Sequence, residues 1–327
     1  MLVTACPTGR NLHVRRDHRL HWVKQKIKGV TGNMKKRNRT SCFLCGAEGE
    51  LAYSEKIAEE EVSNFTYSSR KKPELLHYEY LHCAQCDLRF SSHVPAASEL
   101  DKNYADADFD SGFESHFAAK TYSSVLSRYL SPRVKTLLDV GCGDGAFLVE
   151  SLAKGVRDIA GIEPSQKPAS QAATIVKSKI FVGPWQDFTS SRKFSAITLF
   201  QTIEHLESPE EFVQFSRDKL EPGGILAIVA HDFRSIINKA LSTKSPIFDI
   251  EHLQLFSKKS LTLLFENYGF VVLKNTSFIN KYPLSYLIRL SPLPAKVKES
   301  WLFCRSPIAK FALSVPLGNR IVVGRVP

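Results

Sequence analysis

The sequence predicts an α/β protein in which helices cover both faces of a parallel sheet, with a small cysteine-rich module in front of it. Three observations lead to this prediction. Short apolar runs alternate with helical patterns after residue 133, a glycine-rich turn follows the first run, and two Cys-x-x-Cys pairs precede them. Repeated strand–helix alternation is typical of a parallel sheet. A chain of 327 residues has room for one such domain and one module.

We expect four parts along the chain: a basic, disordered arm at 1–40, a cysteine module at 41–92, a helical connector at 93–130, and an α/β domain at 131–327 with a basic insertion at 278–318. The arm is rich in Lys and Arg and poor in apolar residues, which is typical of disorder. Met34 would make an ordinary start just before the module. Residues 1–33 are therefore either a native arm or lie before the true start.

The net charge of +11 is unevenly distributed along the chain. The arm contributes +10 and the insertion +5, so the rest is mildly acidic. This distribution argues against a chain-wide nucleic-acid surface and favours local contacts with phosphate groups or an anionic membrane. No run of eighteen apolar residues and no signal-peptide pattern occurs, so we expect a cytoplasmic protein without a membrane-spanning helix.

The predicted elements of the α/β domain follow from apolar runs, helical periodicity and Gly or Pro stops. The expected strands are 134–140, 159–162, 180–182, 196–200, 225–229, 271–273 and 321–323. The expected helices are 146–152, 165–175, 209–220 and 257–268.

The most informative motif is the glycine-rich turn after the first strand, which holds Asp139, Gly141, Gly143 and Gly145. Glycine permits positive φ and lets a ligand touch the backbone. The spacing Gly-x-Gly-x-Gly differs from the dinucleotide fingerprint, which places a pyrophosphate at a helix N-terminus. The turn therefore suits a phosphate-free ligand with an amino-acid tail, whose ammonium Asp139 can bind. Glu163 ends the next strand and can accept both ribose hydroxyls. The structural alternative is a tight βα turn.

These residues resemble the motifs of class I S-adenosylmethionine (SAM)-dependent methyltransferases. The resemblance covers residues 133–273 and implies a Rossmann-like, seven-stranded fold with a reversed last strand. It also implies SAM contacts at Gly141, Gly143, Gly145 and Glu163, with Asp187 and Phe188 near the adenine. Gln201, in the loop after the fourth strand, is a further candidate contact beside the SAM methyl group.

Cys42, Cys45, Cys83 and Cys86 form the two Cys-x-x-Cys pairs, with 37 residues between the pairs. Two such turns can close a tetrahedral four-thiolate shell, which is a structural zinc site of the zinc-ribbon kind. Gly46 supports this, because the turn often needs positive φ there. We expect a solvated hairpin tip between the pairs, at 59–61 and 70–72. The alternative is four buried free cysteines.

The order of a zinc module followed by a SAM domain resembles a bacterial group of methyltransferases from sugar and surface-polysaccharide pathways. That resemblance suggests a sugar acceptor. Glu204 and His205, after the fourth strand, resemble the Glu-His pair of many family members. His205 is the candidate base, because imidazole titrates near neutral pH, and Glu204 could orient it. His252 is a third catalytic candidate at the acceptor pocket. Capping or packing roles remain the alternatives for all three.

The insertion 278–318 interleaves aromatic and basic residues and contains several prolines. This pattern indicates either a lid on the domain or an interfacial surface for a peripheral contact with the inner face of a membrane.

The leading hypothesis is transfer of a methyl group from SAM to oxygen or carbon of a sugar, polysaccharide or glycolipid. The first alternative is an O-methyltransferase of a small lipid or quinone precursor. The second is a nucleic-acid-binding or nucleic-acid-modifying zinc protein, which the lack of a recognition strip in the module argues against. The acceptor, the methylated atom and the oligomeric state stay open.

Overall fold

The computed structural model describes residues 36–57, 67, 75–107, 114–130, 134–290 and 311–327. The expected hairpin tip of the module and residues 1–35 of the basic arm lie outside these ranges. No helix in the described ranges is long and apolar enough to cross a membrane.

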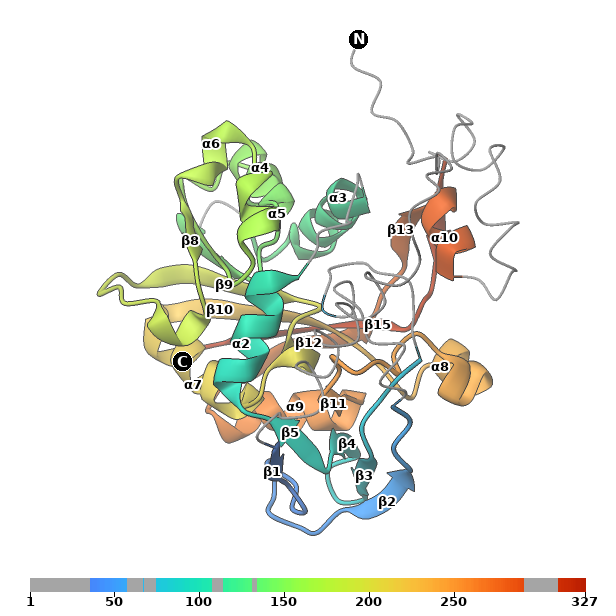
Figure 1. Ribbon diagram of the computed structural model, residues 1–327. Coiled ribbons are helices and arrows are strands. Elements are labelled where there is room, and N and C mark those ends of the chain that lie inside the picture. The colour runs from blue at the N-terminus through green and yellow to red at the C-terminus, as the bar shows by residue number, and fades with distance from the viewer. Residues whose placement is uncertain (1–35, 58–66, 68–74, 108–113, 131–133, 291–310) are drawn as a thin grey trace, which may run out of the picture.

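A seven-stranded sheet forms the centre of the molecule (Figure 1). Its order is β12-β15-β10-β9-β6-β7-β8, and only β15 runs antiparallel to its neighbours. The strands are β6 (Thr136–Val140), β7 (Asp158–Glu163), β8 (Ile180–Val182), β9 (Phe194–Phe200), β10 (Leu220–His231), β12 (Val271–Ser277) and β15 (Asn319–Arg325). The expected seven-stranded sheet with a reversed last strand is thereby confirmed.

Helices cover the two faces of this sheet (Figure 1). One face carries α3 (Glu114–Leu126), α4 (Ala146–Ala153) and α6 (Thr174–Lys177), whose apolar residues pack with alternate residues of the strands. The other face carries α7 (Pro209–Lys219) and α9 (Lys258–Asn267). Ser257 caps α9 by accepting a hydrogen bond from the backbone N–H of Ser260 at 3.2 Å.

The helix expected at 165–175 is two short helices, α5 (Gln166–Ser170) and α6. The first helix ends at Ser170, and Ala173, which is extended with φ −58° and ψ 143°, is the N-cap of the second. The break lets Val176 pack on the glycine turn, where a Cβ on Gly145 would lie 2.9 Å from Val176 Cγ2. Tertiary packing therefore overrides local helix propensity here.

The cysteine module is a four-stranded antiparallel sheet in the order β11-β4-β3-β2. Its strands are β2 (Glu50–Tyr53), β3 (Tyr80–Cys83), β4 (Leu88–Ser91) and β11 (Gln254–Leu255). The last of these belongs to the α/β domain in sequence, so the expected boundary at residue 92 does not separate two independent sheets. The module also shares an apolar cluster with the face that carries α7 and α9.

The structure differs from the sequence-based expectation for the end of the basic arm. β1 (Lys36–Asn38) pairs with β5 (His93–Pro95), and Arg39 is buried. Residues 36–40 are therefore part of the folded module, because their backbone and one guanidinium find partners inside it.

The expected connector contains two helices, α2 (Ala97–Asp106) and α3. Later in the sequence, α8 (Ile236–Leu241) follows β10. Three further elements precede β15: β13 (Asn280–Pro283), α10 (Leu284–Leu290) and β14 (Ala312–Val315). Short 3-10 turns lie at η2 (Trp185–Asp187), η3 (Ile203–His205) and η4 (Ser242–Lys244).

Candidate functional site

A cavity of about 1020 Å³ opens at the carboxyl ends of β6, β7, β9 and β10. In an open α/β sheet this is the edge where ligands bind. The glycine turn and Glu163 form one part of its lining, and His205, His231 and His252, whose rings lie close together, form another part, which we call the histidine end. The cavity is thus large enough for two ligands side by side.

The glycine turn has the conformation that its sequence requires. Gly141, Gly143 and Gly145 have φ of 69°, 57° and 73°. A Cβ on Gly141 would lie 2.5 Å from Thr202 Oγ1, so a side chain there meets both strain and a clash. Space beside Gly143 is open, and its backbone faces the cavity.

Glu163 is held rigidly by the backbone around it. Its Oε2 accepts the N–H of Gly143 at 2.8 Å, and its Oε1 accepts the N–H of Ser165 at 2.9 Å. Burial raises the pKa of this carboxyl, although the two N–H groups counteract the shift. Each oxygen keeps a lone pair for a further donor, so the carboxylate can accept two hydroxyls of a ligand.

Asp139 is buried at the end of β6, and Thr198 Oγ1 donates to its Oδ1 at 2.7 Å. Burial raises the pKa of Asp139 to about 7. A buried carboxyl of this kind is stabilised in its ionised form by a cation placed beside it. It therefore suits the ammonium group of an amino-acid tail.

The two residues expected near the adenine are not part of the cavity lining. Asp187 is exposed and Phe188 packs on Phe181, and neither lines the cavity. Trp185 and Gln186 line it instead. The sequence motif is loose, and the register of the 3-10 turn at this point was not visible in the spacing of the residues.

Gln201 lines the cavity in a left-handed conformation, with φ of 52°. Its Nε2 donates to Asn319 Oδ1 at 3.0 Å, and Asn319 Nδ2 donates to Tyr282 Oη at 2.7 Å. Gln201 Oε1 is buried and has no hydrogen-bond partner among the described residues. A ligand donor in the cavity would satisfy this oxygen.

The structure differs from the expectation that Glu204 orients His205. Glu204 is fully buried, its Oε1 accepts the backbone N–H of His231 at 2.6 Å, and it does not line the cavity. Burial raises the pKa of Glu204 to about 7. This carboxyl therefore holds the end of β10 against the turn after β9. Adjacent residues of a 3-10 turn point in different directions, which is why the sequence pairing did not become a contact.

His205 finds other partners. Its Nδ1 lies 2.9 Å from Tyr104 Oη and 4.0 Å from Glu251 Oε2, and its ring meets the ring of His252 edge-on, with centroids 4.9 Å apart. Burial, with the nearby Glu251 carboxylate as a second cause, raises the pKa of Tyr104 well above its usual range. Tyr104 therefore stays a neutral phenol, and its oxygen can accept a hydrogen bond from an Nδ1–H of His205, which leaves Nε2 without a proton. Glu251 was not anticipated as part of this group.

His252 lies at the same end of the cavity. Its Nδ1 is 2.7 Å from the carbonyl oxygen of Ile247, and its ring lies 5.5 Å from that of His231. Asp249 also lines this end. The rings of Tyr282 and Tyr286, which also line the cavity, stack with centroids 5.3 Å apart. The lining of the cavity therefore contains three imidazoles and an aromatic pair.

The sulfur atoms of Cys42, Cys45, Cys83 and Cys86 all lie within 4.8 Å of one another. The Sγ atoms of Cys45 and Cys83 are 3.6 Å apart. In a tetrahedral shell with Zn–S bonds of about 2.3 Å, neighbouring sulfur atoms are about 3.8 Å apart. Both turns also end in positive φ, at Gly46 with 74° and at Asp87 with 53°. This donor set fits a zinc ion held by four thiolates.

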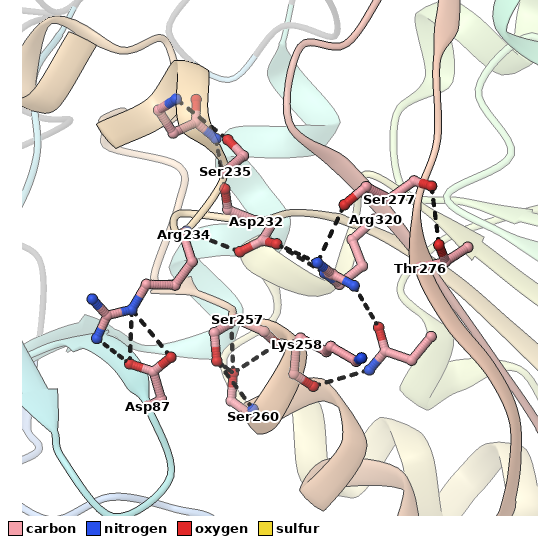
Figure 2. A network of polar contacts seen from close by, with 12 residues as sticks. Asp87, Asp232, Arg234, Ser235, Ser257, Lys258, Ser260, Thr276, Ser277 and Arg320 are labelled. Carbon is pink, nitrogen blue, oxygen red and sulfur yellow. Dashed lines mark hydrogen bonds and ion pairs between the residues drawn. The ribbon is translucent and has the colours of Figure 1, made fainter. Parts of the chain in front are cut away.

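A polar network joins the second cysteine turn to the loop after β10 (Figure 2). Arg234 Nη2 and Nε donate to Asp87 Oδ1 at 2.5 and 3.0 Å. Two residues earlier, Asp232 Oδ2 accepts from Arg320 Nη2 at 2.7 Å. The loop that begins with His231 is therefore tied on one side to the cysteine module and on the other to β15.

The sheet order with one reversed strand, a glycine turn after the first strand and an acid at the end of the second together define the class I methyltransferase fold. Residues 115–275 match the sequence profile of a family described as a methyltransferase domain. The chain therefore contains a SAM-dependent methyltransferase domain.

Two curated relatives show how the acceptor varies among similar proteins. The chain is 34% identical over 108 residues to a dTDP-3-amino-3,4,6-trideoxy-alpha-D-glucopyranose N,N-dimethyltransferase of Streptomyces venezuelae. That match covers 32% of this chain and 45% of the relative. The chain is 32% identical over 116 residues to a ubiquinone biosynthesis O-methyltransferase of Histophilus somni, covering 32% and 46%. The matches thus span about half the length of these relatives.

Among solved structures, the chain is similar to a putative methyltransferase from Bacillus halodurans, with a TM-score of 0.46 and 14% sequence identity. That comparison covers 63% of this chain and 99% of the other. The magnesium protoporphyrin IX methyltransferase of Synechocystis, solved with S-adenosylhomocysteine (SAH), gives a TM-score of 0.44 at 9% identity, over 72% and 89% of the chains.

Proposed function

We propose that this protein transfers a methyl group from SAM to an acceptor bound at the histidine end of the cavity. The observation that carries the proposal is the cofactor end: Asp139 and Glu163 lie buried at adjacent strand ends, with the glycine turn between them. SAM supplies an electrophilic methyl group when it is bound there. A thermal-shift titration with SAH tests this end; an unchanged melting temperature at saturating SAH would exclude the cofactor assignment.

In this proposal His205 takes the proton that the acceptor loses when it is methylated. Tyr104 Oη and Glu251 Oε2 both lie on the Nδ1 side of the imidazole, at 2.9 and 4.0 Å, so Nε2 is the atom that takes the proton. His205→Ala is expected to lower kcat by two or more orders of magnitude, about the usual contribution of a general base. Its affinity for SAH is expected to stay unchanged, since His205 stands at the acceptor end. Full turnover in this variant would exclude the role.

The acceptor class that we favour is a sugar-bearing molecule. The aromatic pair Tyr282 and Tyr286 offers a flat surface for a sugar ring, and Asp249 and Glu251 offer acceptors for its hydroxyls. The Streptomyces relative, which acts on an amino sugar, supports this class and adds nitrogen to the atoms to be tested. Formation of SAH should be measured with a panel of glycosides, amino sugars and glycolipids.

The second candidate acceptor is a small lipid or quinone precursor, which the ubiquinone-pathway relative supports equally. Ile237, Leu241, Leu287 and Leu317 also line the cavity, and their apolar side chains could pack against such a molecule. Turnover of phenolic lipids, with none of glycosides, would favour this candidate.

We further propose that the four cysteines hold one structural zinc ion. The four-thiolate geometry supports this, and such a closed shell leaves no position for catalysis. Metal analysis of protein purified without chelators should find about one zinc per chain. A value near zero would remove the zinc assignment and leave the methyltransferase assignment in place.

Peripheral contact with a membrane is the remaining proposal for the insertion 278–318, of which residues 291–310 lie outside the described ranges. Ile279 and Phe311 are strongly exposed in the described part, which supports an apolar surface there. Co-sedimentation with anionic vesicles tests it, and equal pelleting after removal of 278–318 would speak against it.

A further inference from the structure

The turn that carries His205 is held by one fully buried amide. Gln254 Nε2 lies 2.9 Å from the carbonyl oxygen of Ile203, 3.0 Å from that of Glu204 and 2.8 Å from that of Leu206. These carbonyls flank His205 on both sides in the chain. The backbone N–H of Leu253 also donates to the carbonyl of Glu204, at 2.8 Å. The segment that follows His252 therefore holds the turn that contains His205 in place through hydrogen bonds.

The oxygen of this amide faces an arginine of the cysteine module. Arg39 Nη2 lies 3.4 Å from Gln254 Oε1 and 2.9 Å from the carbonyl oxygen of Leu253. Because a guanidinium can only donate, the oxygen of the amide faces Arg39 and its NH2 group faces the three carbonyls. The three carbonyls and Arg39 therefore require the same orientation of Gln254, and Arg39 holds it from the side of the module.

Arg39 itself is fixed inside the module. It is 9% exposed, its Nε donates to the carbonyl of Ser91 at 3.2 Å, and its guanidinium lies 5.2 Å from the ring centroid of Phe90 and 5.5 Å from that of Phe43. Phe43 stands between the two cysteines of the first pair. The position of Arg39 therefore depends on the folded cysteine turn.

The module holds His252 by a second route. Tyr80, on β3, donates its hydroxyl to the carbonyl oxygen of His252. The backbone N–H of Ser91 donates to the carbonyl of Leu253 at 2.8 Å, and β11 then continues as a strand of the module's sheet. Two of the three histidines, His205 and His252, are thus held by contacts that lead back to the module.

We propose that Arg39 and Gln254 are positioning residues for His205 and His252. The cysteine module consequently contributes to the geometry of the acceptor site. Neither residue lines the cavity, so each acts through the histidines and not on a ligand. The inference rests on the proposed function for the role of the histidines in methyl transfer. Rigid support of this kind keeps catalytic groups within a fraction of an ångström of their working geometry.

The test uses the full-length, zinc-loaded protein with 15N-labelled histidine, with and without SAH. Arg39→Met keeps an unbranched side chain between the two phenylalanine rings and removes every donor. We expect the ring 15N–1H signals of His205 and His252 to shift or broaden, while those of His116 on α3 stay in place and the dissociation constant for SAH changes by less than about twofold. Unchanged signals for His205 and His252 would overturn the proposal.

Arg192→Met is the matched control, because Arg192 also stacks on a phenylalanine, with its guanidinium 4.8 Å from the Phe194 ring centroid, and pairs with Asp158 away from the cavity. It should leave both histidines unchanged. If Arg39→Met does not fold, Arg39→Lys is measured in its place, because it keeps the positive charge and loses the bidentate donor geometry. Smaller shifts of the same two histidine signals are then expected. Unchanged signals would contradict the proposal.

With an acceptor that turns over, Arg39→Met should lower kcat and leave the KM for SAM unchanged, and Arg39→Lys should recover part of kcat. A rise in the KM for SAM alone would contradict a positioning role. Failure of the wild-type protein to bind SAH would overturn the proposed function instead, and the histidine signals would still report on the contacts from Arg39.

Discussion

Asp139 and Glu163 are two buried carboxyls at adjacent strand ends with different environments. Glu163 accepts two backbone N–H groups, which favour its ionised form, whereas Asp139 accepts one hydroxyl, from Thr198. Burial raises the pKa of both, and that of Asp139 to about 7. The two residues are therefore suited to different parts of one ligand: a cation beside Asp139 and hydroxyls beside Glu163.

The pKa of Asp139 predicts how cofactor affinity depends on pH. The carboxyl must be ionised to hold an ammonium group, so affinity for SAH should fall as the pH drops below about 7, by roughly tenfold per pH unit. It should level off above that value. Calorimetric titration across this range measures the slope, and Asp139→Asn should bind weakly with little dependence on pH. A flat profile in the wild-type protein would contradict the assigned ammonium contact.

In the protein without ligand, ionisation of the same carboxyl lowers the stability of the fold. Its folded pKa lies above the ordinary value of 3.8, so its contribution to stability is fully present below 3.8 and is lost as the pH rises through about 7. SAH should therefore stabilise the protein most above that pH, because the ligand's ammonium group compensates the buried charge.

Glu163 yields a second prediction about the cofactor end. In Glu163→Gln, the NH2 group of the new amide would face the backbone N–H of Gly143 or Ser165, where the carboxylate now accepts two donors. One acceptor for the ligand's hydroxyls becomes a donor, so affinity for SAH should fall by about tenfold or more, in line with the loss of a buried hydrogen bond. Glu211→Gln, on the exposed face of α7, is the control and should bind SAH normally. Equal affinity in the two variants would show that Glu163 does not contact the cofactor.

Among the elements, the two-residue strand β11 connects the cysteine module to the acceptor end of the cavity. It pairs with β4 of the cysteine module and begins two residues after His252. Gln254, on the same strand, holds the turn after β9. Since the module fixes β11, loss of order in the module should spread to the acceptor end before it reaches the glycine turn.

Metal removal tests this coupling between elements. Treatment of the purified protein with a strong chelator should increase amide hydrogen exchange in residues 75–95 and 249–256. Exchange in β6 and β7, and in the glycine turn between them, should change little. Re-addition of zinc should restore the original protection. Equal deprotection of both ends of the cavity would mean that the module stabilises the whole domain uniformly.

At the scale of the whole molecule, the cysteine module and the sheet share one core. Leu88 and Phe90 of β4 belong to the same buried cluster as Phe256 and Leu261, and a bidentate ion pair joins Asp87 to Arg234 (Figure 2). Arg39 and Asn267 add side-chain contacts across the boundary. A boundary of this kind does not resemble a flexible linker between independent domains.

This shared core predicts that the zinc-loaded protein unfolds in a single cooperative transition. Circular dichroism at the sheet signal and fluorescence of Trp185, which is half-buried beside α7, should give the same midpoint in urea. Trp22 and Trp301 lie outside the described ranges, so both are replaced by Phe for this measurement. Two separate midpoints would show that the module folds independently of the sheet.

Several features of this protein follow from local sequence. The alternation of apolar runs predicted the strands and their order along the chain, because burial between helices on both faces requires continuous apolar strands. Three glycines at alternate positions predicted the turn, because each needs positive φ. The two Cys-x-x-Cys pairs predicted the thiolate cluster, because each pair is a local unit.

The partners of the acceptor-end residues were determined by tertiary structure. Glu204 stands beside His205 in sequence but bonds to the backbone of His231, while Tyr104 and Glu251 reach the imidazole from distant segments. Arg39 appeared to be part of a solvated basic arm and is buried against β11. Periodicity and motif spacing describe contacts within a few residues. Which side chains meet across a cavity depends on how distant segments pack, and only the folded chain specifies that.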